Sequence, residues 1–79
     1  MRRIRELRED NDKTQKEIAE IIGTTQQHYS KIENETSDIP AEKLRKLCIY
    51  YNLSADYILE LIDVPKPLYK IRKNAQDHS

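Results

Sequence analysis

The chain has 79 residues, of which 37% are hydrophobic and 35% charged, with one glycine, one cysteine and a formal net charge of zero. This length suits one small domain, and a single cysteine excludes both an internal disulfide and a cysteine-rich zinc site. The apolar runs are too short for a transmembrane span or a signal-peptide core, so the cytoplasm is the expected location.

Helical periodicity and capping signals predict a first helix over residues 2–11 and two more helices after it. The second helix opens at Thr14, which together with Glu17 has the spacing of a capping box. Gly23 is expected to end this helix, because the left-handed position that follows a helix favours glycine. Thr25 then provides the N-cap of the third helix.

The fourth helix is predicted to begin near Pro40, a residue suited to a first helical turn. Its expected inner face includes Cys48, which we interpret as a small buried apolar side chain. The fifth helix is capped by Ser54 and should present Tyr57, Ile58, Leu59, Leu61 and Ile62, with Ile58 and Leu59 directed inward. Strand alternation is absent, so the predicted fold class is an all-α bundle of five helices.

Charge is unevenly distributed along the chain although its sum is zero. Residues 1–16 carry six basic against four acidic side chains, whereas residues 17–39 carry one lysine against five acidic side chains. We therefore expect a domain over 1–63 and a basic tail over 64–79, in which Pro65 and Pro67 block a helix. Two readings of the tail stay open: a frayed end, or an arm that touches DNA, a protein partner or another subunit.

The segment from residue 15 to residue 34 has the pattern of a helix-turn-helix. Ala19 is small where two helices must cross closely, and Gly23 lies four residues later, where a tight turn needs positive φ. In this geometry the second helix of the motif, which is the third helix of the chain, projects its N-terminal residues, and these can enter the major groove of DNA.

The polar start of the third helix of the chain then has a chemical reason. Glutamine can pair bidentately with the N6/N7 edge of adenine, a threonine methyl can contact thymine, and lysine can reach guanine or phosphate. These preferences make Thr25, Gln26, Gln27, His28 and Lys31 the candidate base contacts. The alternative is a solvated polar surface, and for His28 the two readings are evenly balanced.

At these residues the chain resembles the Cro and phage-repressor (Xre-type) helix-turn-helix proteins. The likeness covers residues 3–62 and is carried by "TQKEIAEIIGTTQQHYSKIEN" and "IPAEKLRKLCIYYNLSADYIL". It implies a lambda-repressor-like five-helix domain, with the helix-turn-helix at helices two and three, that binds double-stranded DNA as a homodimer. By position it implies phosphate contacts at Gln15 and Asn34, and an ion pair between Arg8 and Glu33.

The chain departs from the family pattern after the third helix. Glu35 stands where the family usually has glycine, so either a left-handed cap is strained or the helix ends differently. The loop that follows is acidic, whereas phage repressors often carry Lys or Arg there for phosphates. Phosphate anchoring should therefore depend more on the start of helix two, including Lys16, and on the basic N-terminal segment.

The apolar end of the fifth helix is the predicted dimer interface. Five small helices can hardly cover Leu61 and Ile62 in a single chain, which would leave an exposed apolar patch. In the family that the chain resembles, a dimer contact is expected near this position.

The sequence therefore predicts a DNA-binding transcriptional regulator, a repressor on a two-fold operator, without enzymatic activity, cofactor or metal. No Ser-His-Asp spacing, H-x-x-x-H pair or glycine-rich phosphate loop is present. Two alternatives remain: an antitoxin whose tail wraps a toxin, and a protein-interaction module that has the fold but does not bind DNA. The acidic segment "ENETSDIP" favours the latter, because backbone contacts normally dominate affinity for DNA.

Overall fold

The computed structural model describes residues 1–68, which form five α-helices and, within that range, no strand. The helices are α1 (Arg2–Asp10), α2 (Gln15–Ile22), α3 (Gln26–Glu33), α4 (Ala41–Tyr51) and α5 (Ala55–Ile58). The predicted all-α fold with five helices is confirmed. None of the helices in this part of the chain is long and apolar enough to cross a membrane.

Three helices begin at side-chain caps that the sequence predicted. Thr14 and Glu17 form a reciprocal capping box, in which Glu17 N donates to Thr14 Oγ1 at 3.1 Å and Thr14 N donates to Glu17 Oε1 at 2.8 Å. The Thr25 hydroxyl accepts from the third residue of α3, and the Ser54 hydroxyl from the third residue of α5. Each cap satisfies a backbone donor that the first turn of a helix leaves free.

All five helices of the described residues end in the same left-handed turn. The residues with positive φ are Asp12 (55°), Gly23 (77°), Glu35 (61°), Asn52 (56°) and Glu60 (66°). After each of them, the next backbone N–H donates to the carbonyl five residues earlier, which is the Schellman pattern. Only one of the five is glycine, so four non-glycine residues occupy a backbone region that L-residues rarely adopt. Glu35 thus occupies a left-handed cap, the first of the two endings considered for helix three.

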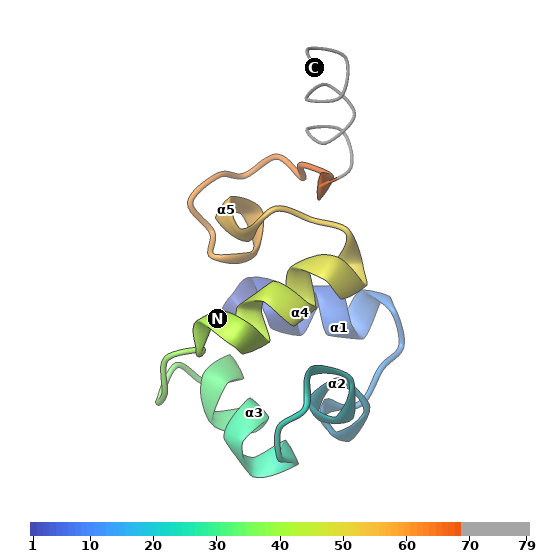
Figure 1. Ribbon diagram of the computed structural model, residues 1–79, viewed down its shortest axis with the longest axis vertical. Helices are drawn as coiled ribbons and strands as arrows, with labels where there is room; N and C mark the ends of the chain where they lie inside the picture. Colours follow the sequence, from blue (N-terminus) through green and yellow to red (C-terminus); the bar gives the residue numbers. More distant parts are fainter. Residues whose placement is uncertain (69–79) are drawn as a thin grey trace.

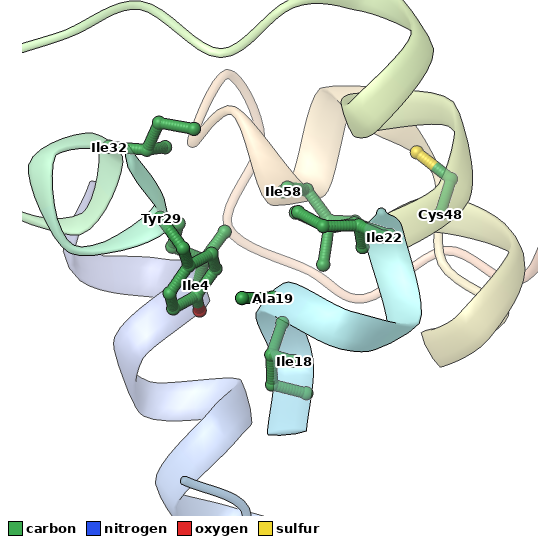
Figure 2. Close-up of a cluster of buried hydrophobic side chains, with 9 residues drawn as sticks. Ile4, Ile18, Ala19, Ile22, Tyr29, Ile32, Cys48 and Ile58 are labelled. Carbon is green, nitrogen blue, oxygen red and sulfur yellow. The ribbon is translucent and has the colours of Figure 1, made fainter. Parts of the chain in front are cut away.

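The core is built from all five helices. Its fully enclosed side chains are Ile4, Ile18, Ala19, Ile22, Tyr29, Ile32, Leu47, Cys48 and Ile58. Figure 2 shows the α2 side chains at the centre of this cluster, facing α1, α3, α4 and α5. Burial raises the pKa of the Cys48 thiol, as expected for a thiol in apolar surroundings.

Helix five is shorter than the sequence predicted. It ends at Ile58, so Leu59, Leu61 and Ile62 follow the helix and do not lie on its face. Leu59, expected to point inward, is 37% exposed and that prediction was wrong. The physical reason lies in α1, because Arg3 Nη1 donates to the carbonyls of Tyr57 and Ile62, each at 2.9 Å. These two bonds hold the chain in a turn where apolar spacing alone suggested a longer helix.

The chain continues past this turn and packs back on the domain. The Ser54 N–H donates to the Lys66 carbonyl at 2.8 Å, and the Leu68 side chain packs against the core. In the view of Figure 1, α2 and α3 lie below α4, and α5 lies above it. The rest of the predicted basic tail, residues 69–79, lies outside the described residues.

Candidate nucleic-acid interface

Helices α2 and α3 pack closely against each other across a tight turn. Ala19 is only 1% exposed where the two helices meet, and Gly23 has φ 77° at the turn itself. Tyr29 and Ile32 anchor the inner side of α3 in the core (Figure 2). Because this inner side is fully buried, the opposite side of the helix necessarily faces away from the domain.

The outer surface of α3 carries the residues predicted to contact bases. Thr25, Gln26, Gln27 and Lys31 are exposed, and His28 is half-buried. Beside them a shallow groove is lined by Gln15, Gln26, Gln27, Ser30 and Lys31, so the start of α2 borders the outer side of α3. Amides, a hydroxyl and an ammonium group line this groove, and they can donate to and accept from the polar edges of bases.

His28 is oriented by a residue that sequence analysis did not select. Thr24 Oγ1 lies 2.9 Å from His28 Nδ1, which is hydrogen-bond distance. The hydroxyl can donate or accept, so it suits either tautomer of the ring. In both cases Nε2 remains the nitrogen available to a ligand. Thr24 precedes the helix and lies four residues before His28. This spacing indicates a contact only when the turn before α3 brings the two side chains together.

The three residues predicted at phosphates differ in their surroundings. Lys16 is exposed in the first turn of α2. Gln15 is half-buried, and its Nε2 donates to Glu33 Oε1 at 3.2 Å. Asn34 follows the last residue of α3, and its Oδ1 accepts from Arg5 Nη2 at 2.9 Å. Because the Asn34 oxygen accepts from Arg5, the orientation of the side-chain amide is fixed. Its NH2 group can then donate to an anion.

The side chain of Glu33 is fully buried beneath this surface and is held by several donors. Arg8 donates from Nε to Glu33 Oε2 at 2.7 Å and from Nη2 to Glu33 Oε1 at 3.2 Å, so the structure brings these two predicted partners together. Arg5 Nε lies 3.5 Å from the same carboxylate. A buried carboxylate with this many donors locks α3 against α1 and the start of α2.

The environment of Glu33 keeps it ionised. Burial alone would raise the pKa of the carboxyl, but hydrogen bonds, led by those from Arg8, hold the pKa below its ordinary value. The bond to Glu33 in turn raises the pKa of the Arg8 guanidinium. Arg8 also donates from Nη1 to the Lys13 carbonyl at 2.9 Å, which fastens the loop before α2.

Several contacts that position the interface involve residues that sequence analysis did not select. Lys43 Nζ donates to the Gly23 carbonyl at 2.9 Å and so connects α4 to the turn before α3. The amino group of Met1 donates to the Glu33 carbonyl at 2.8 Å, at the end of α3. These bonds join residues twenty or more positions apart, so no local sequence pattern predicts them.

The predicted dimer residues lie in the turn after α5. Leu61 is 70% exposed, whereas Ile62 is half-buried. Val64 is 72% exposed close by in the chain. This part of the chain therefore presents apolar surface, although from a turn and not from the end of a helix.

Comparison with known proteins places the chain in a family. A family model described as "Helix-turn-helix domain" matches residues 1–64. This chain belongs to the Xre-type helix-turn-helix family. It is also 39% identical over 75 residues to a protein of Bacillus subtilis (strain 168) named "Uncharacterized HTH-type transcriptional regulator YobD". The match covers 95% of this chain and 66% of that relative, so the chain spans just under two thirds of the relative's length. No solved structure matches the chain.

Proposed function

We propose that this chain is a sequence-specific DNA-binding transcriptional regulator that represses as a homodimer on a two-fold operator. The observation that carries the proposal is the surface of α3, where exposed amides and a lysine project from a helix whose other side is fixed in the core. Family membership and a relative named as a transcriptional regulator support the same class. A rigid helix suits base recognition, because its side chains need little reordering on binding.

In this proposal the start of α3 enters the major groove. Gln26 and Gln27 pair with base edges, Thr25 offers its methyl to thymine, and Lys31 reaches guanine or phosphate. His28 adds a contact through Nε2, because Nδ1 is held by Thr24. The start of α2 and the end of α3 then lie along the backbone, with Gln15, Lys16 and Asn34 at phosphates.

A homodimer follows from the small number of bases that one α3 can read. Two copies related by a two-fold axis would read half-sites about 34 Å apart, one turn of the duplex. Closing such a dimer requires a self-complementary patch. The exposed apolar surface at Leu61, with Ile62 beside it, supports the turn after α5 as that patch.

Base recognition is tested by comparing two kinds of DNA. The preferred site is first selected from a random duplex library with the wild-type chain. Gln26→Ala or Gln27→Ala should then weaken binding to that site by roughly 1–3 kcal/mol and binding to random duplex much less. Equal losses on both duplexes would assign these glutamines to the backbone. Absence of any binding at low salt would instead favour the protein-interaction module that the acidic loop suggests.

Assembly is tested by charge insertion at the proposed patch. Leu61→Glu should abolish the dimer in sedimentation and weaken operator binding while the helical circular dichroism spectrum is retained. Ile49→Glu is the matched control, because Ile49 is 59% exposed on α4, outside the turn after α5. A wild-type chain that stays monomeric at high concentration with operator present would refute the homodimer. Repression itself is read from a reporter gene placed behind the selected site.

A further inference from the structure

Two lysines of α4 converge on the turn between α2 and α3. Lys43 Nζ donates to the Gly23 carbonyl at 2.9 Å. A Cβ atom built on Gly23 would lie 3.4 Å from Lys46 Nζ and 3.6 Å from Lys43 Nζ, so both ammonium groups meet at one point. Two like charges held this closely repel each other, and an anion between them would relieve that repulsion.

The first turns of α4 have little negative charge to balance these lysines. Glu42 Oε1 lies 3.3 Å from Lys43 Nζ, but the Glu42 side chain is 64% exposed and Arg45 adds a further positive charge. A hydrogen bond from Lys43, together with the charges of Lys43, Lys46 and Arg45, lowers the pKa of the Glu42 carboxyl. The local field is therefore positive, although the chain as a whole is neutral.

This pair of lysines borders the start of α3. Gly23 directly precedes Thr24, whose hydroxyl holds His28 in the first turn of α3. The groove is lined by Gln15 of α2 and by Gln26, Gln27, Ser30 and Lys31 of α3, with Gln26 and Ser30 farthest around the helix from His28. On a helix His28 projects from the opposite side to Gln26 and Ser30. The lysines and the groove therefore flank the same helix on its two sides.

The loop after α3 does not provide positive charge for a DNA phosphate on the side of α3 away from the groove. Its side chains include Glu35 and Asp38, and both are exposed. Carboxylates repel phosphates. In the proposed complex, the DNA strand on the side of α3 away from Gln15 and Lys16 would therefore have to meet other cationic side chains.

We propose that Lys43 and Lys46 form a phosphate clamp that binds a backbone phosphodiester of duplex DNA on the side of α3 away from Gln15. This inference rests on the proposed DNA-binding function. Lys43 is positioned before DNA arrives, because the Gly23 carbonyl holds its ammonium group and its side chain is only 18% exposed. Lys46 supplies the second charge. Ammonium groups suit this task, since they bind phosphate as point charges without a fixed hydrogen-bonding plane.

The test measures affinity against salt concentration for a selected site and for random duplex. Lys46→Gln should weaken binding to both duplexes alike and lower the slope of log K against log salt by about 1. Lys46→Arg should retain the wild-type slope. Arg45→Gln is the matched control, because Arg45 is an exposed cation on the same helix that does not approach Gly23. Glu42→Gln removes the competing carboxylate and should strengthen binding to both duplexes.

Each outcome decides between the two proposals. A wild-type chain that binds no duplex at low salt overturns the DNA-binding function and the clamp together. A wild-type chain that binds, while Lys46→Gln keeps its affinity and slope, overturns the clamp alone. Equal losses in Lys46→Gln and Arg45→Gln would also overturn it, because general charge would then explain the effect. If Lys46→Gln fails to fold by circular dichroism, Glu42→Gln decides, and unchanged affinity in that variant contradicts the clamp.

Discussion

The α2–α3 unit and the segment after α5 (residues 59–68) both contain a left-handed turn, yet they are built in different ways. In the α2–α3 unit that turn is Gly23, α2 and α3 are capped by side chains, and the inner surface is buried. After α5 the turn is Glu60, the helix has four residues, and Leu61 and Val64 are exposed. The first region presents polar groups from a rigid base, whereas the second presents apolar groups that one chain does not cover.

The two regions also differ in what holds them. Glu33 anchors α3 through a buried carboxylate with donors from α1 and α2. The segment after α5 is held by Arg3, whose guanidinium lies 4.2 Å from the centre of the Tyr57 ring and donates to two carbonyls. The difference teaches that α3 is held by a fully buried carboxylate with several donors, whereas the segment after α5 is held by the part-buried guanidinium of Arg3.

The largest expected effect comes from breaking the ionic network. Glu33→Ala leaves the Arg8 guanidinium partly buried without its carboxylate, and should lower the free energy of unfolding by about 3–5 kcal/mol. Urea denaturation measures the loss. Glu35→Ala is the control, because its side chain is 73% exposed, and it should change the free energy by less than about 0.5 kcal/mol. A loss below about 1 kcal/mol for Glu33→Ala would contradict the anchoring role.

A second comparison concerns the turn at Glu60, where buried Ile58 precedes the turn and exposed Leu61 follows it. Ile58→Ala should cost about 2–5 kcal/mol of stability, because it removes fully buried methyl groups and leaves a cavity. Leu61→Ala should change stability by less than about 0.5 kcal/mol when measured at concentrations where the chain is monomeric. Thermal unfolding of both variants checks the prediction. Equal losses would mean that Leu61 is packed within the single chain.

Acid should weaken the α2–α3 unit through Glu33. The pKa of its carboxyl is lower in the folded chain than in the unfolded one, so the unfolded state takes up a proton first as pH falls. The stability from Glu33 is therefore complete above the ordinary carboxyl pKa of about 4.3. It is lost as pH falls through the lower folded-state pKa. Denaturation between pH 7 and pH 2 measures this loss, and Glu33→Gln should flatten that part of the curve.

The smallest expected effect is a gain from relieving the left-handed turns. Glu35→Gly should stabilise the chain by roughly 0.5–1 kcal/mol, because glycine adopts positive φ without a steric cost. Glu60→Gly should gain less, because the Glu60 carboxylate accepts from Arg3 N at 3.4 Å and lies 3.9 Å from Arg2 Nη2, whereas the more exposed Glu35 carboxylate lies 3.4 Å from the Met1 amino group. Thermal unfolding ranks the two variants. A larger gain at Glu60 would show that its contacts contribute nothing.

Much of the fold could be predicted because its signals are local. The capping box at Thr14, the turn at Gly23 and the caps at Thr25 and Ser54 each join residues within a few positions of one another. The polar outer side of α3 was predicted in the same way, since helical spacing separates it from Tyr29 and Ile32. The contacts of those side chains with DNA stay predictions.

The end of α5 could not be predicted because its cause lies elsewhere in the chain. Leu59, Leu61 and Ile62 have helical spacing, but hydrogen bonds from Arg3 on α1 favour a turn. Likewise, apolar spacing cannot distinguish a residue that packs on its own chain from one that is left at the surface. The sequence predicts both Leu61 and Ile62 at the surface, whereas in the structure Leu61 is 70% exposed and Ile62 is half-buried, a difference that only the assembled helices decide.

The sequence by itself determined where the helices begin, which side of α2 and α3 is apolar, and which residue forms the turn before α3. Backbone geometry and side chains three or four positions apart are enough for these features. The tertiary structure alone decided the bond from Gln15 to Glu33 and the approach of Lys43 and Lys46 to Gly23. Most of these contacts join separate helices, and their partners meet only after the core has fixed the distances between those helices.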